Sequence, residues 1–204
     1  GQVTEVKDPN NNITQYGYDA VTGYLTSVRQ DPTGINATTQ ITYDIFGNVN
    51  TVTDPNNHVT DYDYNALHWL IQERNPLNFL TKYTRDQNGN VTKVERQADA
   101  GATQWQTVQF TYDVLNNLKT ITDPLNRITT YNYDNNENPI SMVDANTKTT
   151  TYQYDERDFL FKVTDANTPS AGVTQYDYDN NGNLKKILDA KAQATNYTYD
   201  LFDR

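Results

Sequence analysis

Short stretches of this chain alternate between apolar and polar positions. In the segment from Val59 to Tyr64, Thr60, Tyr62 and Tyr64 stand at every second position, which is the period of a strand with two different faces. Thr, Val and Tyr all favour strands. No segment carries a helical period or a convincing helix cap. The pattern therefore predicts an all-β protein of more than a dozen strands.

Turn signals separate these strands. Asp-Pro suits a type I turn, because Asp favours its first position and Pro fixes φ at the second. The fourth position is often Asn or Gly, which tolerate the left-handed conformation that a bulged turn requires; these residues are Asn11, Gly34, Asn57, Asn78 and Asn126. The sequence from Asp44 to Gly47 has the same form. Each unit is thus predicted to hold two strands and two turns, with strands at 49–53 and 59–64.

A Tyr-Asp marker returns throughout the chain. Its first residue stands at Tyr18, Tyr43, Tyr64, Arg85, Tyr112, Tyr133, Tyr154, Tyr178 and Tyr199. Five of the eight steps are 21 residues and the others are longer, as expected if insertions enter loops. We interpret residues 1–204 as a single array of about nine repeats. Both ends lie in repeat phase without an atypical capping unit, so we expect a fragment of a longer array.

The odd period restricts the backbone. Neighbouring strands joined by short turns are antiparallel, and paired residues share a face. For Tyr43 and Tyr64 to share a face, each repeat must contain an odd number of bulges. Either one of the two turns is bulged and the other is not, or a strand carries one bulge. The sequence leaves this choice open, and it does not assign the faces.

Composition narrows the class of protein. Aromatic residues make up 12% of the chain, with 16 Tyr, which argues against a disordered acidic chain. The formal net charge of -10 disfavours nucleic acid and anionic membrane surfaces as partners. There is no Cys, so disulfides and thiolate chemistry are excluded. No apolar run is typical of a signal peptide or a membrane span.

The pattern Y-D-x-x-G-N-L with D-P-x-G/N and a period near 21 residues resembles the YD repeats of the Rhs family. Similar repeats occur in bacterial polymorphic toxins, insecticidal Tc toxin subunits, wall-associated proteins and teneurins. The resemblance covers essentially the whole chain. The chain departs from the pattern at His68 to Leu70, where "HWL" replaces Gly-Asn-Leu, at Arg85, and where Asp-Ala replaces Asp-Pro.

The resemblance implies a YD-repeat β-hairpin array, in which a long antiparallel sheet spirals into a curved or hollow shell. In toxin members the shell encloses a toxic C-terminal polypeptide. By similarity, the chain is expected to be a non-enzymatic shell segment of a secreted or cell-surface bacterial protein. Its expected partners are further repeats and the C-terminal effector of the parent protein, with possible self-association through edge strands.

Candidate reactive residues recur with the repeat, which favours a structural role. The carboxylate pairs Asp61 with Asp63 and Asp177 with Asp179 follow the strand pattern, whereas acid/base catalysis needs one tuned pair in a cleft. His58 and His68 lack a zinc-site spacing and are predicted to be turn-flanking or surface residues. The stretch from Asp177 to Leu188 begins like a calcium loop, but Leu188 replaces the bidentate Glu. We therefore predict no catalytic, metal or cofactor residues.

The repeated tyrosines leave a choice of function. We expect them to pack on one another across strands. The alternative is that rows of Tyr bind sugars or a polypeptide, which would make the chain a cell-surface carbohydrate- or protein-binding module.

Overall fold

The computed structural model describes residues 1–99, 103–165, 172–200 and 202. This part of the chain contains 18 strands and no helix, and so no helix that could span a membrane. Each recorded strand pair joins antiparallel strands that are consecutive in sequence. The prediction of an all-β fold with sequential antiparallel strands is confirmed.

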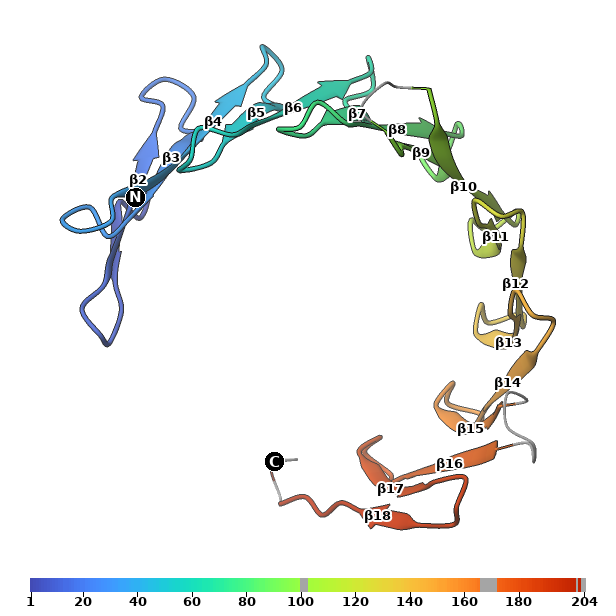
Figure 1. Cartoon of the computed structure of the whole chain (residues 1–204). Coiled ribbons are helices and arrows are strands. Elements are labelled where there is room, and N and C mark those ends of the chain that lie inside the picture. The colour runs from blue at the N-terminus through green and yellow to red at the C-terminus, as the bar shows by residue number, and fades with distance from the viewer. Residues whose placement is uncertain (100–102, 166–171, 201, 203–204) are drawn as a thin grey trace. The chain divides into compact units, whose positions relative to one another are not determined.

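Contacts divide the chain into an N-terminal part, residues 1–107, and a C-terminal part, residues 108–204. Within each part the strands follow one another side by side in a single layer (Figure 1). The strands that begin in the N-terminal part are β1 Glu5–Lys7, β2 Ile13–Tyr18, β3 Leu25–Gln30, β4 Ala37–Tyr43, β5 Val49–Thr53, β6 Val59–Tyr64, β7 Leu70–Arg74, β8 Leu80–Arg85, β9 Val91–Gln97 and β10 Trp105–Tyr112, which ends in the C-terminal part. The remaining strands are β11 Leu118–Thr122, β12 Ile128–Tyr133, β13 Pro139–Val143, β14 Thr149–Tyr154, β15 Leu160–Asp165, β16 Gly172–Tyr178, β17 Leu184–Leu188 and β18 Ala194–Asn196.

The repeat that runs from Asp44 to Tyr64 illustrates the building block. Its strands β5 and β6 have the bounds that the sequence predicts. A Tyr-Asp turn, which starts at Asp44, leads into β5, and an Asp-Pro turn, which starts at Asp54, joins β5 to β6. Both turns have the same length, because the N–H of Asp44 donates to the carbonyl of Asn48 and that of Asp54 to the carbonyl of His58.

A strand bulge explains the odd period. Tyr43 pairs with Val49, but the preceding Thr42 pairs with Thr51, so Asn50 is an extra residue in β5. The same register shift precedes the Tyr-Asp residue in every recorded pair of this kind; the residues are Tyr18, Tyr43, Tyr64, Arg85, Tyr112, Tyr133, Tyr154 and Tyr178. Of the two alternatives, the one with a bulged strand is correct, and the one with unlike turns is wrong. With an odd repeat length and no bulge, equivalent residues of successive repeats would lie on opposite faces of the sheet. The bulge places them on the same face.

The bulge gives the sheet two chemically different faces. Ile41 pairs with Val52, and Val52 pairs with Thr60, so Tyr62 and Tyr64 lie on the face of these residues. We call it the tyrosine face. The other face carries polar side chains that bond across strands. For example, the hydroxyl oxygens of Thr111 and Thr120 lie 2.6 Å apart, and the amide of Gln72 donates to Asp63 at 2.7 Å.

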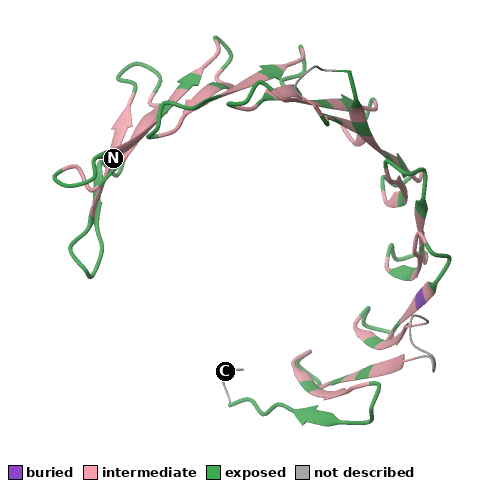
Figure 2. Ribbon diagram, in the orientation of Figure 1, coloured by how far each residue is buried: buried purple, intermediate pink, exposed green. Residues whose placement is uncertain are grey.

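The sheet has no hydrophobic core of its own. Among the described residues no hydrophobic side chain is buried, and the one buried residue is Thr150, at 7% exposure. Figure 2 shows this residue in purple among strands of intermediate burial and exposed turns. The fold is therefore held by backbone ladders, turn hydrogen bonds and half-covered side chains.

The left-handed turn residues agree with the sequence prediction at all but one position. Asn11, Asn57, Asn78 and Asn126 have φ between 60° and 66°. Gly34 was predicted to have the same conformation, and this is wrong, because in its longer loop the left-handed residues are Asp31 and Asn36. The N–H of Gly34 still donates to the carbonyl of Asp31 at 3.1 Å, while the N–H of Asn36 donates to the same oxygen at 2.8 Å. The insertion thus leaves left-handed residues at the two ends of the loop.

Candidate functional site

Each turn is organised by the acidic or amide residue that starts it. In the Tyr-Asp turn of Asp44, one carboxylate oxygen accepts bonds from the N–H groups of Phe46 and Asn48, at 2.8 and 2.9 Å. Its other oxygen accepts a bond from the side-chain amide of Asn48 at 2.8 Å. The two backbone bonds recur in turns of both kinds, which start at Asp8, Asp54, Asn65, Asn75, Asp86, Asp113, Asp123, Asp134, Asp144, Asp155, Asp179 and Asp189.

These bonds stabilise the ionised carboxylates. The side-chain amide of Asn48 is the main reason that the pKa of Asp44 lies below its ordinary value, and the amide of Asn90 acts in the same way on the pKa of Asp86. At Asp179 the backbone N–H of Asn183 is the main cause of a lowered pKa. The carboxylates therefore serve as charged acceptors for turn N–H groups.

A tyrosine hydroxyl forms a hydrogen bond across the open end of a hairpin, opposite the end that is closed by the Asp-Pro turn. The hydroxyl of Tyr133 donates to the carbonyl oxygen of Leu118 at 2.8 Å. The recorded ladder between β11 and β12 begins only at Thr120, so this carbonyl lies beyond the regular pairs. The same bond, which we call the tyrosine clasp, joins Tyr18 to Val3, Tyr43 to Leu25, Tyr154 to Pro139, Tyr178 to Leu160 and Tyr199 to Leu184.

Several clasp tyrosines are also partly buried. Burial is the largest cause of a raised pKa at Tyr133, Tyr154 and Tyr178. The sequence predicts that tyrosines pack on one another across strands, and the ring pairs that the described clasp tyrosines make are with an aromatic residue that follows a turn. Tyr43 packs on Tyr24 with centroids 4.9 Å apart, and Tyr178 packs on Phe159 at 5.0 Å.

The carboxylate pairs occupy strand and turn positions. Asp61 pairs with both Thr51 and Arg74 in the sheet, and Asp63 accepts a bond from Gln72. Asp177 pairs with Lys186, whereas Asp179 starts a turn. Asp177 and Asp179 open the stretch that begins like a calcium loop, and the oxygens of Asp179 accept bonds from Asn181 and Asn183. Of these two candidate ligands, Asp177 is thus a strand residue and Asp179 organises a turn.

Both histidines are exposed residues at turns, which agrees with the prediction of turn-flanking or surface positions. The ring Nδ1 of His58 lies 3.0 Å from Oδ2 of Asp54, the first residue of its turn. His68 is the left-handed residue of the next Tyr-Asp turn, with φ of 62°. Its ring lies 3.0 Å from the amide of Asn48 and packs edge-on against Phe46. Both rings therefore have structural neighbours in the turns.

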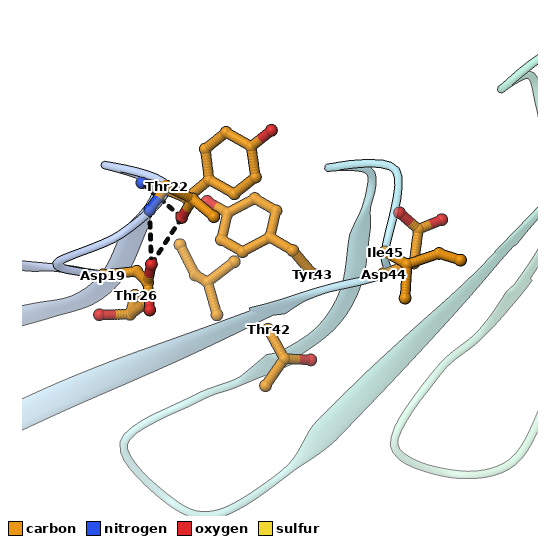
Figure 3. A pocket seen from close by; sticks show the side chains of 9 residues that line it. Asp19, Thr22, Thr26, Thr42, Tyr43, Asp44 and Ile45 are labelled. Carbon is orange, nitrogen blue, oxygen red and sulfur yellow. Dashed lines mark hydrogen bonds between the residues drawn. The ribbon is translucent and has the colours of Figure 1, made fainter.

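An open pocket of about 420 Å³ lies on the tyrosine face beside the first complete Tyr-Asp turn. Figure 3 shows Tyr43 facing this pocket, while Thr42 points to the other side of its strand. Oδ1 of Asp19 accepts bonds from the N–H and hydroxyl of Thr22, at 2.7 and 2.8 Å. Tyr24, which also lines the pocket, stands where most repeats have the Asn of Gly-Asn.

Sequence reasoning missed the carbonyl groups that receive the tyrosine hydroxyls, and it missed where the bulge lies. A signal for the bulge is present in the consensus L/V-x-x-V/I. Val49 and Val52 are three residues apart, yet both pair with residues of the tyrosine face, Tyr43 and Ile41. In a regular strand, residues three apart lie on opposite faces, so the spacing itself indicates one extra residue between them.

Two protein-family models match the chain. The family model for the teneurin YD-shell matches residues 63–204, more than half of the chain, and the model for the RHS repeat matches residues 43–79. The chain belongs to the teneurin YD-shell family. The resemblance to Rhs/YD repeats is thereby confirmed. Among curated protein sequences, none matches the chain.

Solved structures support the YD-shell fold. The chain is similar to part of the Photorhabdus luminescens Tc holotoxin pore, with 15% identity and a TM-score of 0.67 over 93% of this chain and 13% of that one. It is also similar to TcdB2-TccC3 without its hypervariable C-terminal region, with 17% identity and a TM-score of 0.70 over 88% of this chain and 10% of that one. The chain thus spans only a small part of these much longer proteins. Family and fold together point to a structural role, as a YD-shell segment.

Proposed function

We propose that this chain is a section of the wall of a YD-shell that encloses or displays a toxin or effector polypeptide of its parent protein. The observation that carries the proposal is the sheet itself, which is a single layer without a buried hydrophobic side chain among the described residues. A layer with a tyrosine face and a polar face suits a wall between an interior and solvent. The array of about nine repeats, residues 1–204, is then one stretch of that wall.

The similarity to solved Tc toxin structures supports a toxin or effector polypeptide as the partner. One similar structure is TcdB2-TccC3 without a hypervariable C-terminal region, and a variable polypeptide behind a constant shell fits the wall role. In this proposal the chain performs no catalysis, needs no cofactor and works in a secreted or cell-surface protein. Its acidic and histidine side chains serve the turns, as their hydrogen bonds support.

Protease protection tests the wall. The full-length parent protein is treated with protease, and the C-terminal polypeptide is followed beside the same polypeptide made alone. We expect protection in the intact protein and rapid cleavage of the isolated polypeptide. Urea that opens the repeats should abolish the protection. Cleavage of the polypeptide in the intact, folded parent at the rate of the isolated one would refute enclosure.

A second function, carbohydrate binding, is favoured by one observation. The open pocket beside Tyr24 and Tyr43 combines aromatic rings with the carboxylates of Asp19 and Asp44, and aromatic surface next to polar groups suits a sugar ring. Calorimetric titration with soluble glycans tests it. Binding that is lost in Tyr24→Ala would support it, and no heat with any glycan class would refute it.

A further inference from the structure

Three aromatic side chains lie across the turn of the following repeat. We call the residue directly after the left-handed position of a Tyr-Asp turn the post-turn residue. It is Tyr24, Trp69 or Phe159 in three repeats. Each aromatic ring lies at the left-handed residue of the next Tyr-Asp turn, which is Gly47, Gly89 and Gly182, respectively.

These rings occupy the space that a side chain on the glycine would need. A Cβ on Gly47 would lie 2.9 Å from Cζ of Tyr24, and one on Gly182 would lie 2.8 Å from Cζ of Phe159. A Cβ on Gly89 would lie 3.1 Å from Cζ2 of Trp69. All three distances are shorter than the roughly 3.5–4.0 Å at which carbon atoms pack best. Any side chain at these positions must therefore displace the aromatic ring.

Repeats with Asn as the post-turn residue are different. The amide of Asn48 lies 3.0 Å from Nδ1 of His68, the left-handed residue of the next Tyr-Asp turn. The amide of Asn138 donates to Oδ1 of Asp158 at 2.7 Å in the same relation. A short polar post-turn residue thus leaves room for a side chain in the next turn and bonds to it.

The glycines are not required by the turn alone. His68, Asn116, Glu137 and Asp158 occupy the same turn position with φ between 62° and 68°. The three glycines that face an aromatic ring have φ of 88° to 89°. Glycine therefore stands where the preceding repeat fills the space, and not wherever a left-handed residue is needed.

The sequence follows this relation from each repeat to the next. An aromatic residue or Gln is followed by Gly in the pairs Gln2 with Gly23, Tyr24 with Gly47, Trp69 with Gly89 and Phe159 with Gly182. Asn is followed by a residue other than Gly in the pairs Asn48 with His68, Asn90 with Asn116, Asn117 with Glu137 and Asn138 with Asp158.

We propose that the post-turn residue selects which repeat can follow it. A repeat with a large post-turn residue accepts only a repeat whose Tyr-Asp turn has glycine at the left-handed position. A repeat with Asn there accepts a turn with a side chain. Because the repeats are otherwise similar, this matching restricts which repeats can be neighbours and disfavours pairing with a repeat of the wrong kind.

A double-mutant cycle on the 204-residue chain tests the selection. The variants are Tyr24→Asn, Gly47→Asn and the pair together, and the readout is hydrogen exchange of the amides of Asp44 and Asn48 in the Gly47 turn. Gly47→Asn alone should raise the opening equilibrium constant of this turn. Adding Tyr24→Asn should lower this opening equilibrium constant again by about tenfold, which is the coupling expected for residues in contact. A double variant equal to the product of the single effects would overturn the proposal.

The reverse cycle starts from a junction without glycine. Asn138→Tyr should open the turn of Asp158, and adding Asp158→Gly should restore its protection. In this cycle the added glycine makes room for the new ring. The cycle therefore still tests the proposal if the Gly47→Asn variant does not fold. The control combines Tyr24→Asn with Gly182→Asn, which belong to separate junctions and should act independently. Equal coupling in the control, or no rescue by Asp158→Gly, would contradict selection by neighbours.

Discussion

The hydroxyl of Tyr133 donates a hydrogen bond to the carbonyl oxygen of Leu118, 15 residues earlier, at 2.8 Å. Tyr133 stands at the end of β12 and Leu118 at the start of β11, so the bond ties the open end of a hairpin whose other end is an Asp-Pro turn. The bulge beside Leu118 explains why a side chain supplies this donor, because the regular ladder to β12 starts two residues later. The recurring Tyr of the repeat is thus a backbone donor as well as an apolar side chain.

Tyr133→Phe should destabilise the sheet by about 1 kcal/mol, the net value of one hydrogen bond, because it removes the hydroxyl and keeps the ring. Tyr131→Phe is the matched control. Tyr131 lies on the same strand and face, and its hydroxyl makes no hydrogen bond among the described residues, so its loss should have little effect. Urea unfolding of both variants measures the difference. Equal effects would show that the clasp contributes nothing to stability.

Alkaline pH should weaken the sheet through the same tyrosines. Burial raises the pKa of Tyr133, Tyr154 and Tyr178 above the ordinary value of 10.0. A raised folded-state pKa means that the stabilisation is complete below the unfolded pKa and is lost as pH rises through the folded one. We therefore expect unfolding and tyrosinate absorbance to increase together above pH 10. Tyrosinate formation in a sheet that keeps its full stability would contradict this.

Acid should destabilise the turns. Hydrogen bonds hold the pKa of Asp44 and Asp86 below the ordinary value of 3.8. A lowered folded-state pKa gives stability that is present above the unfolded value and lost as pH falls through the folded one. Asp44→Ala should destabilise the turn at neutral pH and flatten its acid dependence, as followed by hydrogen exchange.

Asp44→Asn is the informative companion to Asp44→Ala. Asn65 shows that an amide oxygen can accept both turn N–H bonds, so this variant should lose less stability than Asp44→Ala. It should nevertheless lose the bond to the side chain of Asn48. An Asp44→Asn variant as unstable as Asp44→Ala would show that the charge, and not the acceptor oxygen, organises the turn.

The strands and turns could be predicted from the sequence, because residue type decides them locally. Alternation placed β5 and β6, and Asp and Asn marked the turns. The site of the bulge could not be predicted from the period, since parity requires a bulge without placing it. The tyrosine clasp needs the distance between Tyr133 and Leu118, which depends on that bulge. Gly34 was misassigned because residue preference does not reveal where a longer loop turns left-handed.

Arg85 provides a test at the one repeat that lacks the tyrosine. Its Nη1 donates to the carbonyl of Gly89 at 3.0 Å, while its buried Nε has no hydrogen-bond partner in the described residues. Arg85→Tyr should stabilise the sheet by about 1 kcal/mol, since it removes an unsatisfied buried donor and adds a hydroxyl near Leu70. Arg85→Phe removes the donor and adds the same ring without the hydroxyl, so the difference between the two melting curves reports a restored clasp. A loss of stability in both variants would contradict the prediction.

Thr147 should be an unfavourable residue in its turn. It occupies the left-handed position with φ of 64°, where a β-branched side chain is rarely tolerated. The equivalent residue of the preceding Asp-Pro turn is Asn126, with φ of 60°. Thr147→Asn should raise the free energy of unfolding by about 1 kcal/mol, because Asn relieves the steric cost of this conformation. Asn126→Thr is the matched control and should lower it by a similar amount. Thr147 also donates its hydroxyl to the carbonyl of Asn146 at 2.6 Å, and the substitution removes this bond. If urea unfolding showed Thr147→Asn to be destabilising, the local bond would outweigh the backbone strain, and the left-handed position would not limit the stability of this turn.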